Sequence, residues 1–255
     1  MTDPGREQRV PIFNAPSVVV VLLAVLAVVH LLRVVLPAEV TEWFTLALAF
    51  VPLRYADDLA GDVPGGMLAA VFSPLTHALL HGDFVHLAIN SAWLLAFGSA
   101  LARRVGAVRF LLLFSASAIA GAFMYYAING PIAAVLVGAS GAISGLVGGA
   151  FRFFFRALHL ARHHPLGLEG ACRDVPRAPL SECVTDPQTR LAIIIWLAVN
   201  MITAFVLPQL GGGDAIAWEA HLGGFLFGLL AFAPFDPPPA VPAPPSADDP
   251  GVTLH

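Results

Sequence analysis

The sequence predicts an all-α membrane protein, a bundle of six transmembrane helices with a long first external loop. Only 12% of the 255 residues are charged and 58% are hydrophobic, whereas soluble domains carry about 25% charged residues. Apolar runs long enough to cross a hydrocarbon core of about 30 Å occur six times. The net charge of −4 says little about nucleic acid, but no basic patch is present to bind one, so no nucleic-acid partner is expected and the composition favours the lipid bilayer as the environment.

The six apolar runs define the expected spans in chain order. They lie near Ser17–Leu36, Asp83–Ala102, Ala107–Tyr126, Leu136–Phe155, Leu191–Leu207 and Ile216–Phe235. The first run is too long for a cleavable signal peptide, and Pro37 follows it closely, so it is expected to remain as a span.

The segments between and beyond the spans set the expected domain organisation. The membrane domain should cover residues 17–235, preceded by a cytoplasmic segment at 1–16. The first external loop, 37–82, contains an apolar piece that predicts an interfacial or re-entrant helix. Residues 157–190 predict a polar cytoplasmic loop, and the proline-rich tail 236–255 predicts disorder.

Arginine placement predicts the orientation of the bundle. All thirteen basic residues are arginine, and eleven of them lie at or near one side of the predicted spans. Because cytoplasmic loops carry the excess of basic residues, that side and both termini are expected to be cytoplasmic. With the abundance of alanine, glycine and proline, the composition favours a multi-pass protein of the bacterial inner membrane.

Polar residues inside the spans are the candidates for function, because they are costly in lipid. His86 and Asn90 lie four residues apart in the second span, Ser140 lies in the fourth, and His221 lies in the sixth. At about 1.5 Å rise per residue, Asn90, Ser140 and His221 all lie roughly 18–22 Å from the cytoplasmic ends of their helices. Three helices are thus expected to place polar groups in one layer, nearer the outer face.

The residue types in this layer suit nucleophilic catalysis. A serine hydroxyl needs an adjacent base, which His221 would supply to Ser140. Attack on an amide creates an oxyanion, for which the side chains of His86 and Asn90 and the backbone N–H of Ser140 are candidate donors. Glu219 lies two residues before His221, on nearly the opposite helix face, so the sequence predicts a Ser–His dyad without a carboxylate.

Three motifs in this order resemble the rhomboid family of intramembrane serine proteases. "GASG" at Gly138–Gly141 is similar to the family's GxSG motif, with Ser140 as the nucleophile. "AHLGGFLFG" at Ala220–Gly228 is similar to the last-helix motif that carries the base, here His221. "THALLHGDFVHLAIN" at Thr76–Asn90 resembles the second-helix signature. The resemblance covers roughly residues 72–230.

The resemblance implies an endopeptidase that cuts transmembrane segments of single-span or multi-span membrane proteins near the outer face. It implies no metal and no cofactor, and lateral access of substrate between the second and fifth helices. The chain departs from some members in two places. Phe72 and Ser73 replace a Trp-Arg pair, and Ser144 replaces an aromatic residue that stacks on the base.

Glycines in the fourth and sixth spans predict close helix packing. Gly141, Gly145 and Gly149 recur every four residues, as do Gly224 and Gly228, and such small-residue seams let two backbones approach. Gly138 belongs to the same run. Close approach of these two spans would bring Ser140 to His221.

Other interpretations remain open from the sequence alone. The chain is alternatively a catalytically inactive rhomboid-like protein that binds membrane clients, or a transporter with polar sites on broken helices. His86 and Asn90 are alternatively hydrogen-bonding residues between helices. Cys172 and Cys183 lie in the predicted cytoplasmic loop beside two histidines, but their spacing fits no standard zinc site and they are expected to be reduced.

Overall fold

The computed structural model describes residues 15–56, 63–206, 209 and 216–237. The regular secondary structure of these residues is helical, which confirms the all-α prediction, and β-structure among them is limited to an isolated antiparallel bridge between Phe50 and Leu136. Most of the predicted N-terminal segment 1–16 and of the predicted tail 236–255 lies outside the described residues.

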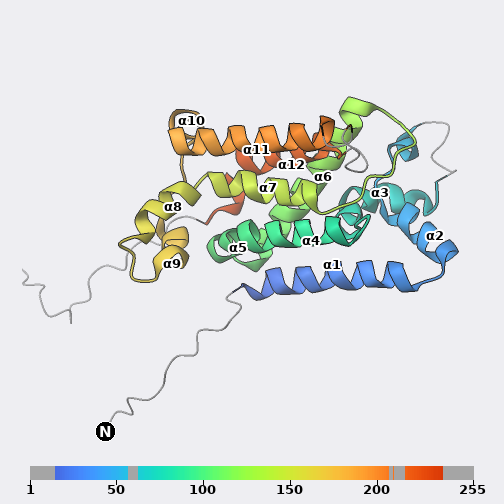
Figure 1. The fold of residues 1–255 in the computed structure, drawn as a ribbon, viewed down its shortest axis with the longest axis horizontal. Helices are drawn as coiled ribbons and strands as arrows, with labels where there is room; N and C mark the ends of the chain where they lie inside the picture. Colours follow the sequence, from blue (N-terminus) through green and yellow to red (C-terminus); the bar gives the residue numbers. More distant parts are fainter. Residues whose placement is uncertain (1–14, 57–62, 207–208, 210–215, 238–255) are drawn as a thin grey trace, which may run out of the picture.

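Four helical stretches are long and apolar enough to cross a membrane: α1 (Ser17–Val35), the continuous helix Phe84–Val105, α6 (Ala107–Asn129) and α11 (Pro187–Phe205). The second stretch consists of α4 (Phe84–Trp93), a π-helical turn η3 (Leu94–Gly98) and α5 (Ser99–Val105). Figure 1 shows α1, α4, α7 and α11 running side by side along the long axis of the molecule. The chain is therefore built as a multi-pass membrane protein.

The span predicted at Leu136–Phe155 is shorter than expected. Its helix, α7, covers only Ser140–Phe151, and α12 likewise covers only Trp218–Leu230. A twelve-residue helix is about 18 Å long, less than the hydrocarbon core. Non-helical backbone beside such a helix is tolerated within a membrane when protein surrounds it. The residues directly beside α7 meet this condition, because Leu136, Gly138 and Ala139 before it and Arg152 and Phe153 after it are buried. Every residue of α7 after Ser140 is also buried, between α6, α12 and the Phe84–Val105 helix.

The first loop contains more structure than the single helix predicted for it. It forms α2 (Ala38–Leu48), η1 (Pro52–Tyr55), α3 (Gly66–Thr76) and η2 (His77–Leu79). This loop holds the segment that leads into α7, since Phe50 and Leu136 exchange two backbone hydrogen bonds of 3.1 and 2.9 Å. The loop therefore supports the start of the short central helix.

The region predicted as a polar cytoplasmic loop, residues 157–190, contains short helices. The region contains α8 (Phe154–Ala161), α9 (Gly167–Asp174) and α10 (Leu180–Thr185), and α11 already begins at Pro187. Buried arginines anchor these short helices to the bundle. Arg104 of α5 donates to the carbonyls of Cys172 and Val175 and pairs with Asp236, which follows the final turn η5 (Ala233–Phe235).

His77 in η2 should make the protein sensitive to acid. Its ring is 2% exposed, Nδ1 donates to the carbonyl of Ser73, and burial lowers its pKa from 6.5 to about 4. The unfolded chain therefore binds a proton that the folded protein excludes, so stability present above pH 6.5 is lost as the pH falls to 4. A shift of this size corresponds to about 3 kcal/mol.

The thermal unfolding midpoint in detergent should therefore fall between pH 7.5 and 4.5, and His77→Gln should reduce that fall. Glutamine keeps a neutral donor for Ser73 but does not titrate in this range. His81, whose pKa is also lowered by burial to about 4, remains in the variant and leaves a residual decrease. An equal decrease in both proteins would contradict the assignment to His77.

Candidate active site

The site begins where the chain turns into α7. Gly138 has φ of +124°, a conformation that favours glycine, so the predicted helix cannot extend back through this residue. Its backbone N–H donates to the carbonyl of His77 at 3.0 Å. Ser140 is the first residue of α7, where backbone N–H groups have no partner within the helix. The turn at Gly138 therefore places the Ser140 side chain beside backbone N–H groups at the start of α7.

Ser140 and His221 form a direct hydrogen bond between α7 and α12. The distance from Ser140 Oγ to His221 Nε2 is 2.7 Å. The two side chains lie 81 positions apart in the chain. This geometry is the one required when a histidine activates a serine nucleophile.

The two helices are close because glycines face backbone across their interface. A Cβ placed on Gly224 would lie 1.9 Å from the carbonyl oxygen of Gly141, and one on Gly228 would lie 1.8 Å from that of Gly145. Gly145 also faces Ser117 of α6, whose Oγ would be 2.0 Å from an added Cβ. These glycines set the separation that places His221 beside Ser140.

His221 has a second partner that the sequence analysis did not identify. Its Nδ1 lies 2.7 Å from Oδ1 of Asn200 on α11. Glu219 points elsewhere and accepts a hydrogen bond of 3.0 Å from Asn129, as expected from its position two residues before His221. Asn200 was detectable in principle, because it is a polar residue in a predicted span. Asn200 carries a neutral amide, whereas the third residue usually expected behind such a histidine is a carboxylate.

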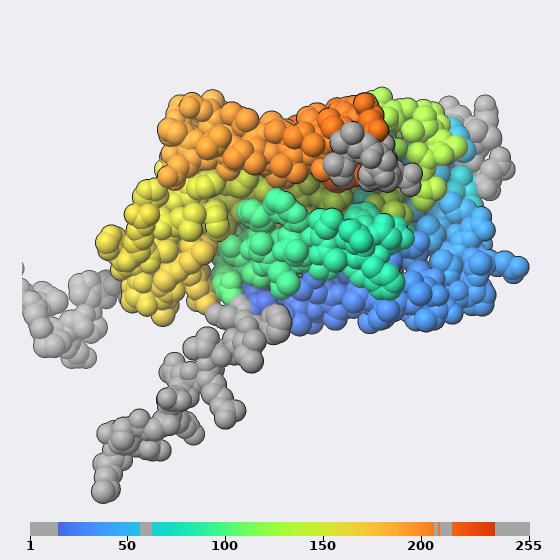
Figure 2. Space-filling view, viewed as in Figure 1, coloured from blue at the N-terminus to red at the C-terminus, as the bar shows by residue number. Residues whose placement is uncertain are grey.

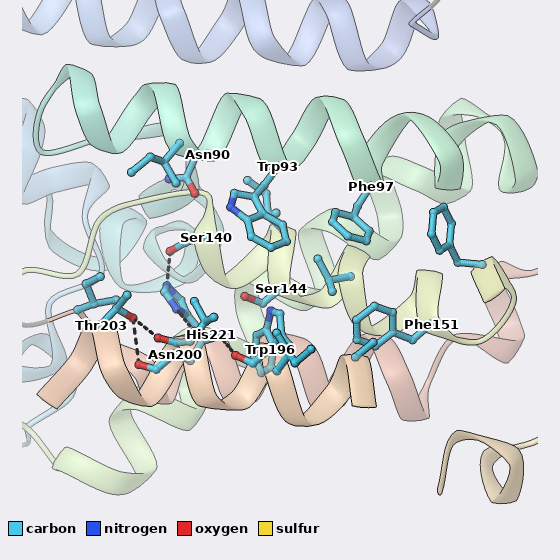
Figure 3. Close-up of a pocket in the computed structure, with 18 of the residues that line it drawn as sticks. Asn90, Trp93, Phe97, Ser140, Ser144, Phe151, Trp196, Asn200, Thr203 and His221 are labelled. Atoms are coloured by element: carbon cyan, nitrogen blue, oxygen red, sulfur yellow. Dashed lines mark hydrogen bonds between the residues drawn. The ribbon is translucent and has the colours of Figure 1, made fainter. Parts of the chain in front are cut away.

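His86 and Asn90 lie on α4. Figure 3 shows Asn90 on the opposite side of Ser140 from α11. Asn90 is 4% exposed, and its Nδ2 has no hydrogen-bond partner among the described residues. His86 lies against Gly138, since a Cβ on that glycine would come within 2.8 Å of His86 Nε2. An unpartnered buried donor and a ring nitrogen thus lie near Ser140, where donors for an anionic oxygen would be needed if this serine were a nucleophile.

A cavity of about 390 Å³ opens at these residues between α4 and α11. Asn90, Ser140, Asn200 and His221 line its polar end. Its remaining walls are mainly apolar and include Trp93 and Phe97 of the Phe84–Val105 helix, Ser144 and Phe151 of α7, and Trp196 of α11 (Figure 3). In the space-filling view α11 and α4 lie on one face of the molecule, with α7 deeper between them (Figure 2). Ser140 is therefore reachable from the side of the bundle.

No cluster of three or more histidine, cysteine, aspartate or glutamate side chains suited to a metal occurs within the described part of the chain. Cys172 and Cys183 are free and buried, and burial raises the pKa of each thiol. Such thiols are poor nucleophiles at neutral pH.

Comparison with known proteins identifies the fold's relatives. A sequence model described as the rhomboid domain matches residues 69–235, well over half of the chain. The chain belongs to the rhomboid family. The resemblance stated from the three motifs is thereby confirmed, and the rhomboid match includes α4, α7, α11 and α12, which carry the site.

One curated rhomboid relative is similar over part of its length. The chain is 35% identical over 132 residues to "Putative rhomboid protease YdcA" of Bacillus subtilis (strain 168). The alignment spans 51% of this chain and 66% of the relative. Membership of the family supports an integral, multi-pass membrane protein, in agreement with the four long apolar helices.

Proposed function

We propose that this protein is an intramembrane serine endopeptidase that cleaves the transmembrane segments of single-span or multi-span membrane proteins. The observation that carries the proposal is the 2.7 Å contact between Ser140 Oγ and His221 Nε2 at the end of a laterally open cavity. The rhomboid-family match and the protease named among its relatives support the same reaction class.

In the proposed reaction Ser140 Oγ attacks the carbonyl carbon of the scissile peptide bond while His221 Nε2 takes the hydroxyl proton. The tetrahedral intermediate collapses when His221 returns this proton to the leaving amine and the carbon–nitrogen bond breaks. The acyl-enzyme that remains is attacked by water, whose proton again passes to His221. Collapse then releases the new carboxyl group and restores the serine hydroxyl.

The negative oxygen of each intermediate would be held by donors from two helices. The backbone N–H of Ser140 at the start of α7, the Nδ2 group of Asn90 and a ring nitrogen of His86 are the proposed donors. The lack of a partner for Asn90 Nδ2 among the described residues supports this role, because a buried donor without an acceptor is costly in the resting protein.

The arginine distribution supports cytoplasmic termini, and the abundance of alanine, glycine and proline supports a bacterial inner membrane. Ser140 and His221 would then lie in the outer half of the membrane, on the side of α2 and α3. Cleavage near the outer face, with water reaching the cavity from that side, agrees with this orientation. The mainly apolar walls of the cavity suit an apolar substrate segment.

The proposal is tested by labelling with a fluorophosphonate probe and by cleavage of a single-span reporter protein in liposomes. The wild-type protein should label and cleave, and Ser140→Ala should do neither. A folded wild-type protein that neither labels nor cleaves would overturn the protease assignment and favour an inactive relative that binds membrane clients.

His86→Ala and Asn90→Ala should each lower kcat for reporter cleavage by about 10²- to 10³-fold, the effect of removing one oxyanion donor. His159→Ala on α8, which is exposed and does not line the cavity, provides the matched histidine control. Unchanged kcat in both α4 variants would instead assign these side chains to helix packing.

A further inference from the structure

We infer that Asn200 of α11 is the positioning residue for His221, so that the site works as a Ser–His–Asn arrangement and not as an isolated dyad. The inference rests on the proposed function. It concerns a neutral side chain on the helix that also forms one wall of the cavity. The 2.7 Å distance between His221 Nδ1 and Asn200 Oδ1 is the starting observation.

The orientation of the Asn200 amide is fixed by its other hydrogen bond. Nδ2 donates to the carbonyl of Trp196 at 2.8 Å, one turn earlier on α11. Rotating the amide by half a turn would bring Oδ1 against that carbonyl, with two acceptors in contact and no donor between them. Oδ1 must therefore face His221.

This orientation determines which ring nitrogen of His221 carries the proton. An amide oxygen only accepts, so Nδ1 must carry the hydrogen that it donates to Asn200 Oδ1. In a neutral imidazole Nε2 is then the acceptor, and it faces the hydroxyl of Ser140. Asn200 thus selects the tautomer that acts as a base toward the nucleophile, and it prevents the ring from rotating about its Cβ–Cγ bond.

Packing on α11 places Asn200 at this position. Trp196 stacks on Phe225 of α12 with ring centroids 4.1 Å apart and an interplanar angle of 15°. Apart from these contacts α11 packs little against the bundle, since only 22% of the residues in its most apolar stretch are buried, compared with 39% for α6. The aromatic stack and the Asn200–His221 bond are therefore major ties between α11 and the bundle near the site.

Through the Asn200–His221 bond, the ability of His221 to act as a base depends on the position of α11. The cavity is bounded by α4 and α11, so displacement of α11 would lengthen the Asn200–His221 bond as it widened the cavity. Without that acceptor either nitrogen of His221 can carry the proton, and the fraction of molecules with a free Nε2 decreases. Substrate would be cleaved when α11 is seated against α12.

Two variants test the role of Asn200 in reporter cleavage. Asn200→Leu removes the acceptor and should lower kcat by about 10- to 100-fold, part of the roughly 10²- to 10⁴-fold that a general base contributes. Asn200→Asp keeps an acceptor in place and should restore much of that rate. Its carboxylate would also stabilise the protonated imidazole, so the acid limb of the pH–kcat profile should move to higher pH.

Asn129→Leu is the matched control. Like Asn200, Asn129 donates from Nδ2 to the backbone carbonyl one turn earlier, here that of Tyr125, at 3.0 Å. It also donates to the Glu219 side chain on α12 at 3.0 Å, but it makes no contact with His221. It should leave kcat and the pH profile near the wild-type values. The inference is overturned if Asn200→Leu and Asn129→Leu lower kcat equally, or if Asn200→Asp has the wild-type profile. Absence of cleavage by the wild-type protein would instead refute the proposed function.

Discussion

Replacing Ser140 with alanine is expected to lower the rate of reporter cleavage by about 10⁴- to 10⁶-fold while the protein remains folded. Among the described residues the hydrogen-bond partner of the Ser140 hydroxyl is His221 Nε2, so the substitution removes the proposed nucleophile and one hydrogen bond. The thermal unfolding midpoint should therefore change little, because one hydrogen bond contributes about 1 kcal/mol. Measuring kcat in liposomes and unfolding in detergent separates the two effects.

The double variant Ser140→Ala/His221→Ala tests whether the two residues act as one unit. Residues that act as one unit are not additive, so the double variant should be no slower than Ser140→Ala alone. Ser117→Ala is the control, because Ser117 is a buried serine on α6 that packs against α7 at Gly145 and lies outside the cavity. Its cleavage should stay near that of the wild type. Substantial cleavage by Ser140→Ala would exclude this serine as the nucleophile.

Residues of the site can be predicted from the sequence where a polar side chain interrupts an apolar span. Ser140 and His221 were identified in this way, and the structure brings them within 2.7 Å of each other. The same rule applies to Asn200, but a neutral amide on a separate helix has no sequence spacing that relates it to His221. Its role depends on the rotation of α11, which is set by contacts such as the Trp196–Phe225 stack.

The ends of helices were less predictable than their existence. The apolar run at Leu136–Phe155 continues through Gly138, and hydropathy does not indicate that this glycine adopts φ of +124°. The helices of region 157–190 are six to eight residues long, too short for a clear period of 3.6 residues. They depend on tertiary contacts, such as the ion pair of Arg156 with Glu182, that are distant in the chain.

Gly224→Ala is expected to destabilise the protein and to reduce cleavage together. Alanine is intrinsically favoured over glycine within a helix by about 1 kcal/mol. Here the added Cβ would lie 1.9 Å from the carbonyl oxygen of Gly141 and 2.8 Å from its carbon, which are backbone atoms that cannot rotate away. Overpacking of this kind costs about 1–3 kcal/mol or more, so the steric effect should outweigh the propensity.

The expected loss of activity follows from the position of these glycines beside the site. Gly141 follows Ser140, and Gly224 lies three residues after His221, so separating the backbones at this contact separates the nucleophile from the base. A displacement of about 1 Å can reduce a rate by about 100-fold. Gly224→Ala should therefore lower kcat by about that factor and lower the thermal unfolding midpoint.

A graded series distinguishes this mechanism from a general intolerance of alanine. Gly228→Ala, with a contact of 1.8 Å, should resemble Gly224→Ala, whereas Gly141→Ala, at 3.2 Å from the Ala220 carbonyl oxygen, should have a smaller effect on the unfolding midpoint. Gly82→Ala, whose Cβ would meet only His86 Nδ1 at 3.9 Å, should leave that midpoint nearly unchanged. Equal unfolding midpoints across the series would show that the α7–α12 separation does not depend on these glycines.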